Sequence, residues 1–322
     1  MKPPIYFFRG EPDKPAVVFI HGLGMDATQW LSPSETRILA GAFPLSIFTR
    51  KPPESLIFKE KIEILPKKFT IGNPVPLNTS LNDLKERGYS VLTWSQTNPL
   101  GSIHYAVEEL KNVVKFASSL SKKGVILIGN SRGGLIGRKF IENSDEKIKA
   151  LITIATPHKG STLAKWVSYV SKLTDIIKPF LKFFPEGIEK ISLRLIDFLR
   201  CDGVRELLPE SSFIKSLKKI EKTDFFSLAG SNSTLFSIYE WKQREENDLF
   251  ILYPEKVFSF PQSLFSFLPE KLIPPEWKSG DGVVSVESAT DHNTGKVFAL
   301  NHAEIIVSAE SRNYILEIVE NL

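Results

Sequence analysis

The sequence of 322 residues has little cysteine and methionine and no long apolar run. Its single cysteine, Cys201, excludes an internal disulfide and permits a cytoplasmic location. No stretch reaches the ~18 consecutive apolar residues of a membrane-spanning helix, so we expect no stable membrane insertion. Residues 1–9 lack the apolar core of ~7 residues and the small-residue cleavage site of a secretion signal. The chain as given is therefore expected to be cytoplasmic, and secreted only if a leader has been removed.

A strong charge of either sign is also missing. The 41 Lys and Arg residues against 37 Asp and Glu leave a net charge of +4, and the two signs alternate along the chain. Such a pattern describes a solvated surface, so we expect no nucleic-acid partner. A hydrophobic fraction of 42% is enough for a large core in a globular protein. Abundant Lys and Glu beside scarce Met and Cys is a composition found in thermophilic proteins.

The most informative segment is Gly129–Gly134, with the sequence Gly-Asn-Ser-Arg-Gly-Gly. It follows the apolar run Val125–Ile128 and precedes a helical pattern from Leu135 to Glu142. A serine in a tight turn between a buried strand and a helix is the nucleophile elbow, which requires glycine where strand and helix crowd together. A G-x-S-x-G string alone is a weak signal, so the surrounding sequence has to support it. The segment predicts that Ser131 is a nucleophile.

A second segment lies upstream, where the apolar run Ala16–Ile20 ends in His21-Gly22-Leu23-Gly24. Acyl transfer through a tetrahedral intermediate needs two N–H donors aimed at the developing oxyanion. The backbone amides of Leu23 and Arg132 are the candidates, because glycines flank the first and the second directly follows the nucleophile. An ordinary glycine-rich turn would be the better interpretation of residues 21–24 if they stood alone.

A third signal lies downstream, in Asp281 within Gly-Asp-Gly-Val-Val and, 21 residues later, His302 within Asn-His-Ala-Glu. A serine hydroxyl needs an imidazole to take its proton, and the imidazole needs a carboxylate to fix its tautomer. The sequence therefore predicts a triad of Ser131, Asp281 and His302. The order Ser, Asp, His along the chain differs from that of the two large serine-protease folds.

Other residues compete for the base and acid roles. We expect His21 to order the loop that it begins, His158 to lie in a loop near the cleft rim, and His104 and His292 to be solvated. Asp291 is the rival acid, but only 11 residues separate it from His302. Most of those are needed for the last strand, so the two side chains would start at opposite ends of it. Asp281 is therefore preferred.

These motifs together resemble the α/β-hydrolase superfamily, and within it the bacterial triacylglycerol lipases and carboxylesterases. The matching segments are residues 21–24, 129–134, 155–161, 280–284 and 301–304. The chain departs from these lipases at Asn130, where they often carry histidine, and at Arg132, a bulky charge beside the nucleophile. The resemblance implies an α/β fold, with a mostly parallel sheet, helices on both faces and an inserted helical cap or lid.

Alternating strand and helix patterns agree with that architecture. We expect residues 5–9 and 16–20 to pair as a hairpin, and further strands at 89–94, 125–128, 150–154, 225–228 and 296–300. Helices are expected at 81–87, 103–119 and 311–320. The predicted organisation is a first core part, 1–159, with an irregular insertion at 31–80; a helical cap, 160–222; and a second core part, 223–322, with an apolar lid-like insertion at about 240–275.

Large apolar side chains in the cap and the lid-like insertion are the candidate substrate-binding residues: Trp166, Phe258, Phe260, Phe265 and Phe267. A packed helical pair and a buried loop would explain them equally well. The predicted function is cleavage of lipid or other apolar acyl esters through an acyl-enzyme, with no cofactor, no metal and at most transient contact with a lipid interface. Acyl transfer and thioester or amide cleavage use the same triad, and a non-catalytic binding protein on this scaffold is the alternative of another class.

Overall fold

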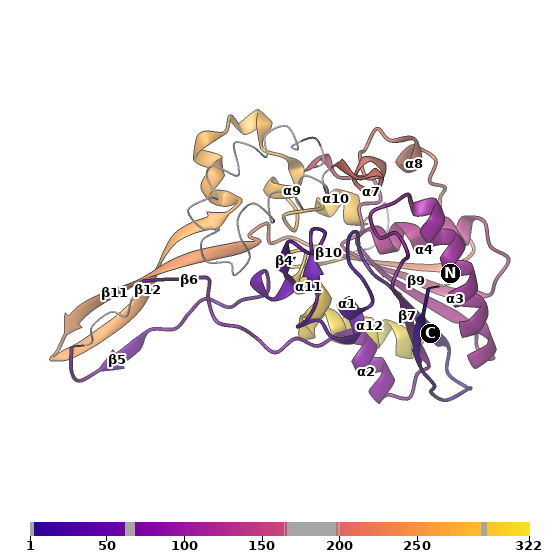
Figure 1. The fold of residues 1–322 in the computed structure, drawn as a ribbon, viewed down its shortest axis with the longest axis horizontal. Helices are drawn as coiled ribbons and strands as arrows, with labels where there is room; N and C mark the ends of the chain where they lie inside the picture. Colours follow the sequence, from indigo (N-terminus) through magenta and orange to yellow (C-terminus); the bar gives the residue numbers. More distant parts are fainter. Residues whose placement is uncertain (1–2, 62–67, 164, 166–197, 199, 291–294) are drawn as a thin grey trace.

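The computed structural model describes residues 3–61, 68–163, 165, 198, 200–290 and 295–322 (Figure 1). Its centre is a seven-stranded sheet with the order β1-β7-β2-β8-β9-β10-β13. All neighbouring pairs are parallel except β1 and β7. The strands are β1 (Ile5–Phe8), β2 (Ala16–Ile20), β7 (Val91–Trp94), β8 (Val125–Asn130), β9 (Ile148–Ile154), β10 (Asp224–Gly230) and β13 (Lys296–Phe298).

Helices cover both faces of this sheet, as expected. Strands β2 and β8 are buried along their whole length, which explains why their apolar runs are continuous rather than alternating. On one face they pack against α3 (Ile103–Leu120) and α4 (Arg132–Glu142). On the other they pack against α2 (Ser80–Glu86) and α12 (Ala309–Asn321). The predicted mixed α/β architecture with a mostly parallel sheet is confirmed.

The expected hairpin between the first two strands is wrong. Strand β1 pairs antiparallel with β7, and β2 lies between β7 and β8 with parallel neighbours on both sides. The connecting residues are tied to the start of β7 instead, because Gly10 N donates to Ser90 Oγ at 2.9 Å and Glu11 N to Gly88 O at 2.8 Å. A completely buried strand such as β2 needs two strand neighbours, whereas the largely exposed β1 suits the sheet edge.

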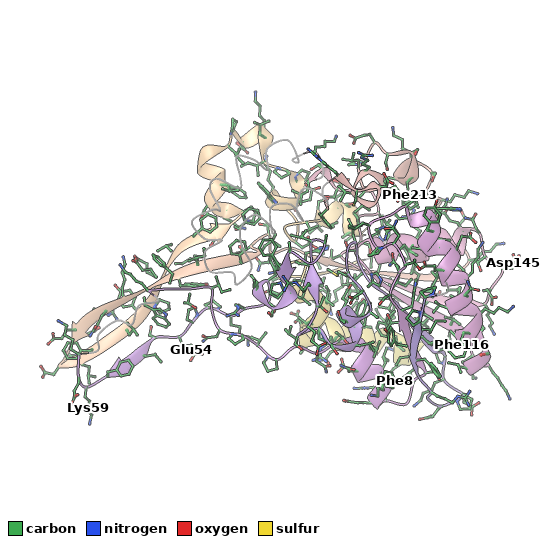
Figure 2. All side chains as sticks on the ribbon, in the orientation of Figure 1. Phe8, Glu54, Lys59, Phe116, Asp145 and Phe213 are labelled. Atoms are coloured by element: carbon green, nitrogen blue, oxygen red, sulfur yellow. The ribbon has the colours of Figure 1, made fainter. Side chains whose placement is uncertain are left out.

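A second sheet forms an arm that projects from the core (Figure 1). Its strands, in the order β5-β12-β11-β6, are β5 (Leu56–Phe58), β12 (Leu249–Phe260), β11 (Phe236–Glu246) and β6 (Phe69–Thr70). Asn247 and Asp248, both with positive φ, make the tight turn between β11 and β12. Figure 2 shows Lys59 at the far end of the arm. The segments at 31–80 and 240–260 therefore meet in one sheet, a pairing that their sequences did not suggest.

Shorter elements complete the described chain. They are α1 (Thr28–Leu31), β3 (Arg37–Ile38), β4 (Phe43–Pro44), η1 (Leu45–Ile47), α7 (Asp202–Glu206), α8 (Ser212–Lys215), η3 (Gln262–Phe267), η4 (Glu270–Leu272), α9 (Pro275–Lys278), α10 (Val286–Thr290) and α11 (Glu304–Val307). Of the predicted cap, 160–222, residues 164, 166–197 and 199 lie outside the described residues. Within the described chain, no helix combines the length and the apolar character needed to cross a membrane.

Candidate active site

Ser131 lies in the turn between β8 and α4 with φ 52° and ψ −125°. A non-glycine residue rarely adopts a positive φ, so this strained turn agrees with the predicted elbow. The turn is held by a hydrogen bond from Ser131 N to Ile154 O at 2.8 Å. At Gly129 an added Cβ would lie 2.5 Å from the Gly133 carbonyl carbon, so the close approach of strand and helix requires glycine there.

The loop after β2 lies against this elbow. A Cβ placed on Gly22 would be 3.5 Å from Ser131 Cβ, and one placed on Gly133 would be 2.4 Å from Ile20 O. The loop that carries Leu23 and the first turn of α4, which begins with Arg132, are therefore packed together beside Ser131. Both expected oxyanion donors come from segments that meet at the serine.

Asp281 and His302 are hydrogen-bonded to each other, with His302 Nδ1 2.8 Å from Asp281 Oδ2. The other carboxylate oxygen of Asp281 accepts from Val283 N at 2.9 Å and Val284 N at 2.7 Å. His302 N also donates to the Asp281 carbonyl oxygen at 3.0 Å. An ionised carboxylate only accepts, so Nδ1 carries the proton and Nε2 keeps a lone pair that can accept one.

Asp281, His302 and Ser131 lie at one edge of the main sheet. A Cβ on Gly230, the last residue of β10, would lie 2.7 Å from Asp281 Cβ. His302 comes four residues after the end of β13, and Ser131 directly follows β8. Because these strands are parallel, their carboxyl ends lie at the same edge, where active sites of open α/β sheets form.

A second set of hydrogen bonds surrounds the histidine. Asn301 Oδ1 accepts from the backbone of Ala303 and Glu304, both at 2.9 Å, and Glu304 Oε2 accepts from Asn301 N at 2.9 Å. This reciprocal pair of hydrogen bonds has the pattern of a capping box and lies just before α11, whose N-cap residue is Ala303. Burial raises the pKa of the Glu304 carboxyl, and hydrogen bonds from Asn301 and Asn232 oppose that shift. Within the described ranges, no group of three or more His, Cys, Asp or Glu residues could hold a metal ion.

His21 is completely buried and orders its loop by hydrogen bonding, as expected. Its Nε2 accepts from Gln96 N at 3.0 Å, so Nδ1 carries the proton and donates to Gly22 O at 2.9 Å. Burial lowers the pKa of His21 to about 4, which keeps the imidazole neutral at physiological pH. A neutral ring with both nitrogens engaged is suited to hold the loop rather than to act as the general base.

The side chain of Arg132 turns into the protein. It donates to Gln96 Oε1 at 2.8 Å and to Pro99 O at 3.3 Å, and also to Gly101 O. Burial lowers the pKa of Arg132 to about 10, against the opposing charge of Glu206. The guanidinium therefore stays charged at neutral pH and fastens the 96–101 loop beside the nucleophile.

The remaining histidines fall into three cases. His158 lies in the loop after β9, as expected, but its side chain is buried against Phe225 and hydrogen-bonds with Arg138 and Thr153. Both ring nitrogens of His158 take part in buried hydrogen bonds, and its position in a loop does not predict them. His104 is exposed, as expected, but is the second residue of α3 rather than part of a loop. His292 and the rival acid Asp291 lie outside the described residues.

The candidate substrate-binding phenylalanines that the structure describes belong to a row of aromatic rings. Phe236 lies 6.2 Å from Phe258 and is stacked on Phe260 at 5.6 Å. Trp277 extends the row, 5.8 Å from Phe260 and 6.3 Å from Phe265. The row thus reaches from the base of the arm to a tryptophan four residues before Asp281. Trp166 and the side chain of Phe267 lie outside what the structure describes.

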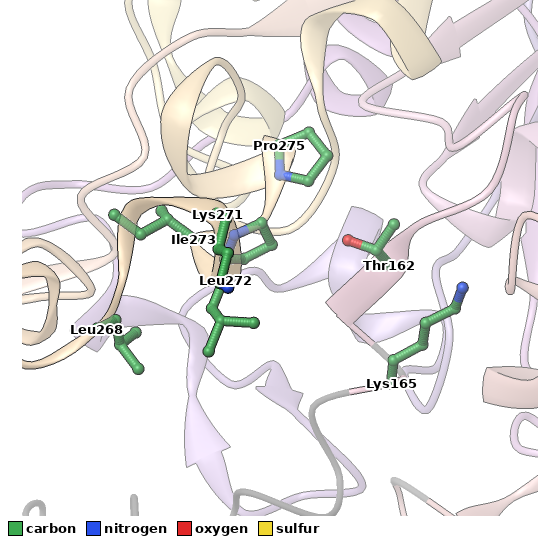
Figure 3. A pocket seen from close by; sticks show the side chains of 8 residues that line it. Thr162, Lys165, Leu268, Lys271, Leu272, Ile273 and Pro275 are labelled. Carbon is green, nitrogen blue, oxygen red and sulfur yellow. The ribbon is translucent and has the colours of Figure 1, made fainter.

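A cavity of about 270 Å³ lies between the start of the predicted cap and the end of the predicted lid-like insertion (Figure 3). Five of its lining residues are apolar, and two lysines and a threonine complete it: Thr162, Lys165, Leu268, Lys271, Leu272, Ile273, Pro274 and Pro275. The buried Glu276 ties the two segments together, because its carboxylate accepts from Thr162 N at 2.6 Å and from Thr162 Oγ1 at 2.7 Å. The cavity is thus built on the segment that leads directly to Asp281.

One buried residue near the serine was missed in the sequence. Gln29 lies beside both the loop at 21–24 and the elbow, and hydrogen-bonds to Gly22 N and to Asn130 Oδ1. No motif marks a lone glutamine in a helix as short as α1. The departure at Asn130 was visible in the sequence, but its partner, 101 residues away, was not.

The sequence model of the palmitoyl protein thioesterase family matches residues 83–184, a segment that includes the elbow. The fold is similar to that of Staphylococcus hyicus lipase, with a TM-score of 0.52 and 13% identity over 98% of this chain and 97% of that one. Bacillus licheniformis lipase BlEst2 in its propeptide form gives 0.52 and 16% over 98% of this chain and 53% of that one. No curated protein matches the sequence. With its sheet order, its elbow and these similarities, the chain has the α/β-hydrolase fold.

Proposed function

We propose that the protein is a serine hydrolase that cleaves carboxylic esters of lipid or other apolar acyl groups. The observation that carries this proposal is the hydrogen bond between the buried Asp281 and His302, at the sheet edge that also bears the strained Ser131. A buried carboxylate that accepts two backbone N–H groups and an imidazole N–H is held in one orientation, as a triad acid must be.

In this mechanism His302 Nε2 takes the proton of Ser131 as Oγ attacks the acyl carbon. The amides of Leu23 and Arg132 stabilise the oxyanion that forms, and His302 returns the proton to the leaving alcohol. Water then attacks the acyl-enzyme with His302 again as the base. Asp281 orients the imidazole and stabilises its charged form throughout.

The cavity at Leu268–Pro275 supports the choice of an apolar acyl group. Its walls are mostly aliphatic, and each buried methylene of a substrate contributes about 0.8 kcal/mol. The match to palmitoyl protein thioesterases favours one second candidate, cleavage of a long-chain thioester, because ester and thioester hydrolysis use the same groups. The leaving group, an alcohol or a thiol, is the only difference between the two reactions.

The test compares wild type with Ser131→Ala, using p-nitrophenyl esters, an emulsified triglyceride and a palmitoyl thioester as substrates. Ser119→Ala, an exposed serine on α3, is the matched control. We expect Ser131→Ala alone to abolish cleavage, and a fluorophosphonate probe to label Ser131 alone. Labelling at another serine, or activity that survives in Ser131→Ala, would overturn the assignment. A wild-type protein that binds acyl chains but cleaves none of these substrates would instead be a binding protein.

A further inference from the structure

The side chain of Gln29 bridges the loop at 21–24 and the nucleophile elbow. Its Oε1 accepts from Gly22 N at 2.8 Å, and its Nε2 donates to Asn130 Oδ1 at 2.9 Å. Asn130 Nδ2 in turn donates to Ile154 O at 3.2 Å, on the strand next to β8. Gln29 and Asn130 are both fully buried. The two amides therefore form a fixed link from the loop, past the elbow, to the main sheet.

This link requires an amide. One planar group must accept a hydrogen bond from a backbone N–H and donate another to a side-chain oxygen, which glutamine can do and methionine cannot. Polar side chains are seldom fully buried, and those that are nearly always have their hydrogen bonds satisfied. A purely structural role would explain why this buried amide has all its hydrogen bonds. A structural role would not explain why its partners are Gly22, directly before Leu23, and Asn130, directly before Ser131.

Three successive amides of the loop show what the link does. Gly22 N is taken by Gln29, and Gly24 N donates to Pro99 O at 3.1 Å. Between them, Leu23 N has no hydrogen-bond partner among the described residues. Glycines on both sides leave the loop conformationally free, so fixing their amides determines where the Leu23 N–H points.

The opposite side of the loop is also held by a residue that flanks the nucleophile. Arg132 donates to Gln96 Oε1 at 2.8 Å, and Gln96 N donates to His21 Nε2 at 3.0 Å. The residues on either side of Ser131 are thus both linked to the loop at 21–24. Asn130 is linked through Gln29, and Arg132 is linked through Gln96. Any shift of Ser131 relative to the loop would break hydrogen bonds on both sides.

We propose that Gln29 is a positioning residue, which holds the Gly22 amide against Asn130 so that the Leu23 N–H faces the oxyanion formed at Ser131. The inference rests on the proposed hydrolase function. It assigns Gln29 no contact with substrate. Its contribution is to the transition state, because an oxyanion donor acts on charge that is absent from the bound ester.

The test is Gln29→Met, which keeps the length of the side chain and removes both hydrogen bonds. Loss of one oxyanion donor lowers kcat by ~10²–10³-fold, and a misplaced donor still gives part of the stabilisation. We therefore expect kcat to fall by about 10- to 100-fold while KM changes less than about threefold. The inhibition constant of an alkyl trifluoromethyl ketone, which adds to Ser131 and forms an oxyanion, should rise by a similar factor.

The matched control is Ser121→Ala, since Ser121 also joins two backbone groups, Lys14 O and Lys123 N, but lies at the other end of β8. It should lower thermal stability without changing kcat or ketone affinity. All variants are assayed below their unfolding transitions. If Ser131→Ala is inactive and folded Gln29→Met keeps both kcat and ketone affinity within about threefold, the positioning role is wrong. If Ser131→Ala remains active, the hydrolase function itself fails.

Discussion

The side-chain amide of Asn301 donates to the carbonyl oxygen of Phe48 at 2.9 Å, across 253 positions of the chain. The same nitrogen donates to Thr234 O at 3.1 Å, close to the base of the arm. Since Asn301 directly precedes His302, the loop that carries the proposed base is fastened both to the insertion at 31–80 and to the connection between β10 and β11. The insertion, which has no family motif, therefore contributes to holding the base.

Asn301→Ala should loosen this loop. It leaves one buried and one half-buried carbonyl group without a donor and removes the acceptor just before α11, so we expect the free energy of unfolding to fall by about 2–4 kcal/mol. Activity should fall as well at temperatures where the variant is folded, because His302 is less firmly placed. Urea unfolding and kcat measure the two effects. Asn143→Ala, which removes an exposed amide, should change neither.

Asp281→Asn tests the proposed acid. The amide would present a donor or a weaker acceptor to His302 Nδ1 and favour the wrong tautomer, so we expect kcat to fall by up to ~10⁴-fold with little change in KM. Asp291→Asn is the comparison and should have little effect. The reverse ranking, measured with one p-nitrophenyl ester, would transfer the role of acid to Asp291.

Burial of His21 predicts a pH dependence of stability. Its pKa falls from 6.5 to about 4 on folding, so between these values the unfolded chain binds a proton that the folded protein does not. The neutral, buried His21 therefore contributes fully to the free energy of unfolding above pH 6.5. As the pH falls toward 4, the free energy of unfolding decreases through this group by about 3 kcal/mol in all.

The measurement compares unfolding free energies of wild type and His21→Asn at pH 7 and pH 4.5. The titration of carboxylates affects both proteins, so it cancels in the difference between them. We expect the advantage of wild type over the variant to shrink at the lower pH. An advantage that stays constant, or grows, would mean that His21 is protonated in the folded protein.

The sequence predicted those parts of the fold and site whose signal is local. The apolar runs of β2 and β8 marked buried strands, and glycines beside Ser131 marked a turn that only glycine permits. The α/β architecture followed from the alternation of such segments. Each of these signals lies within about ten residues, so one sequence is enough to detect it.

What the sequence did not predict depends on partners far along the chain. The place of β1 is decided by its pairing with β7, about 85 residues away, while its own residues favour a hairpin with β2 equally well. The arm needs residues 56–58 beside 250–252, and the role of Gln29 needs Asn130. Apolar pattern and spacing describe the strands and turns themselves, and contain no information about which distant segments meet.

The last prediction concerns the acyl group. If the cavity lined by Leu268 and Leu272 holds an acyl chain, four more methylenes on the substrate could raise kcat/KM by up to roughly two orders of magnitude. We therefore expect octanoate and laurate esters to be cleaved faster than acetate. Replacing both leucines by serine should flatten this profile, because the cavity would lose apolar contact with the chain while Ser131, Asp281 and His302 stay in place.

Leu249→Ser is the matched control, since Leu249 is an exposed leucine on the arm, outside the cavity lining. It should leave the profile of acetate, butyrate, octanoate and laurate esters unchanged. A preference for acetate in wild type would show that no acyl pocket supports the reaction. A leucine double variant that is folded and keeps the wild-type profile would show that the acyl chain binds at another surface. The aromatic row at Phe260 and Phe265 would then be the next surface to test. Both rings contact Trp277, in the segment that leads to Asp281.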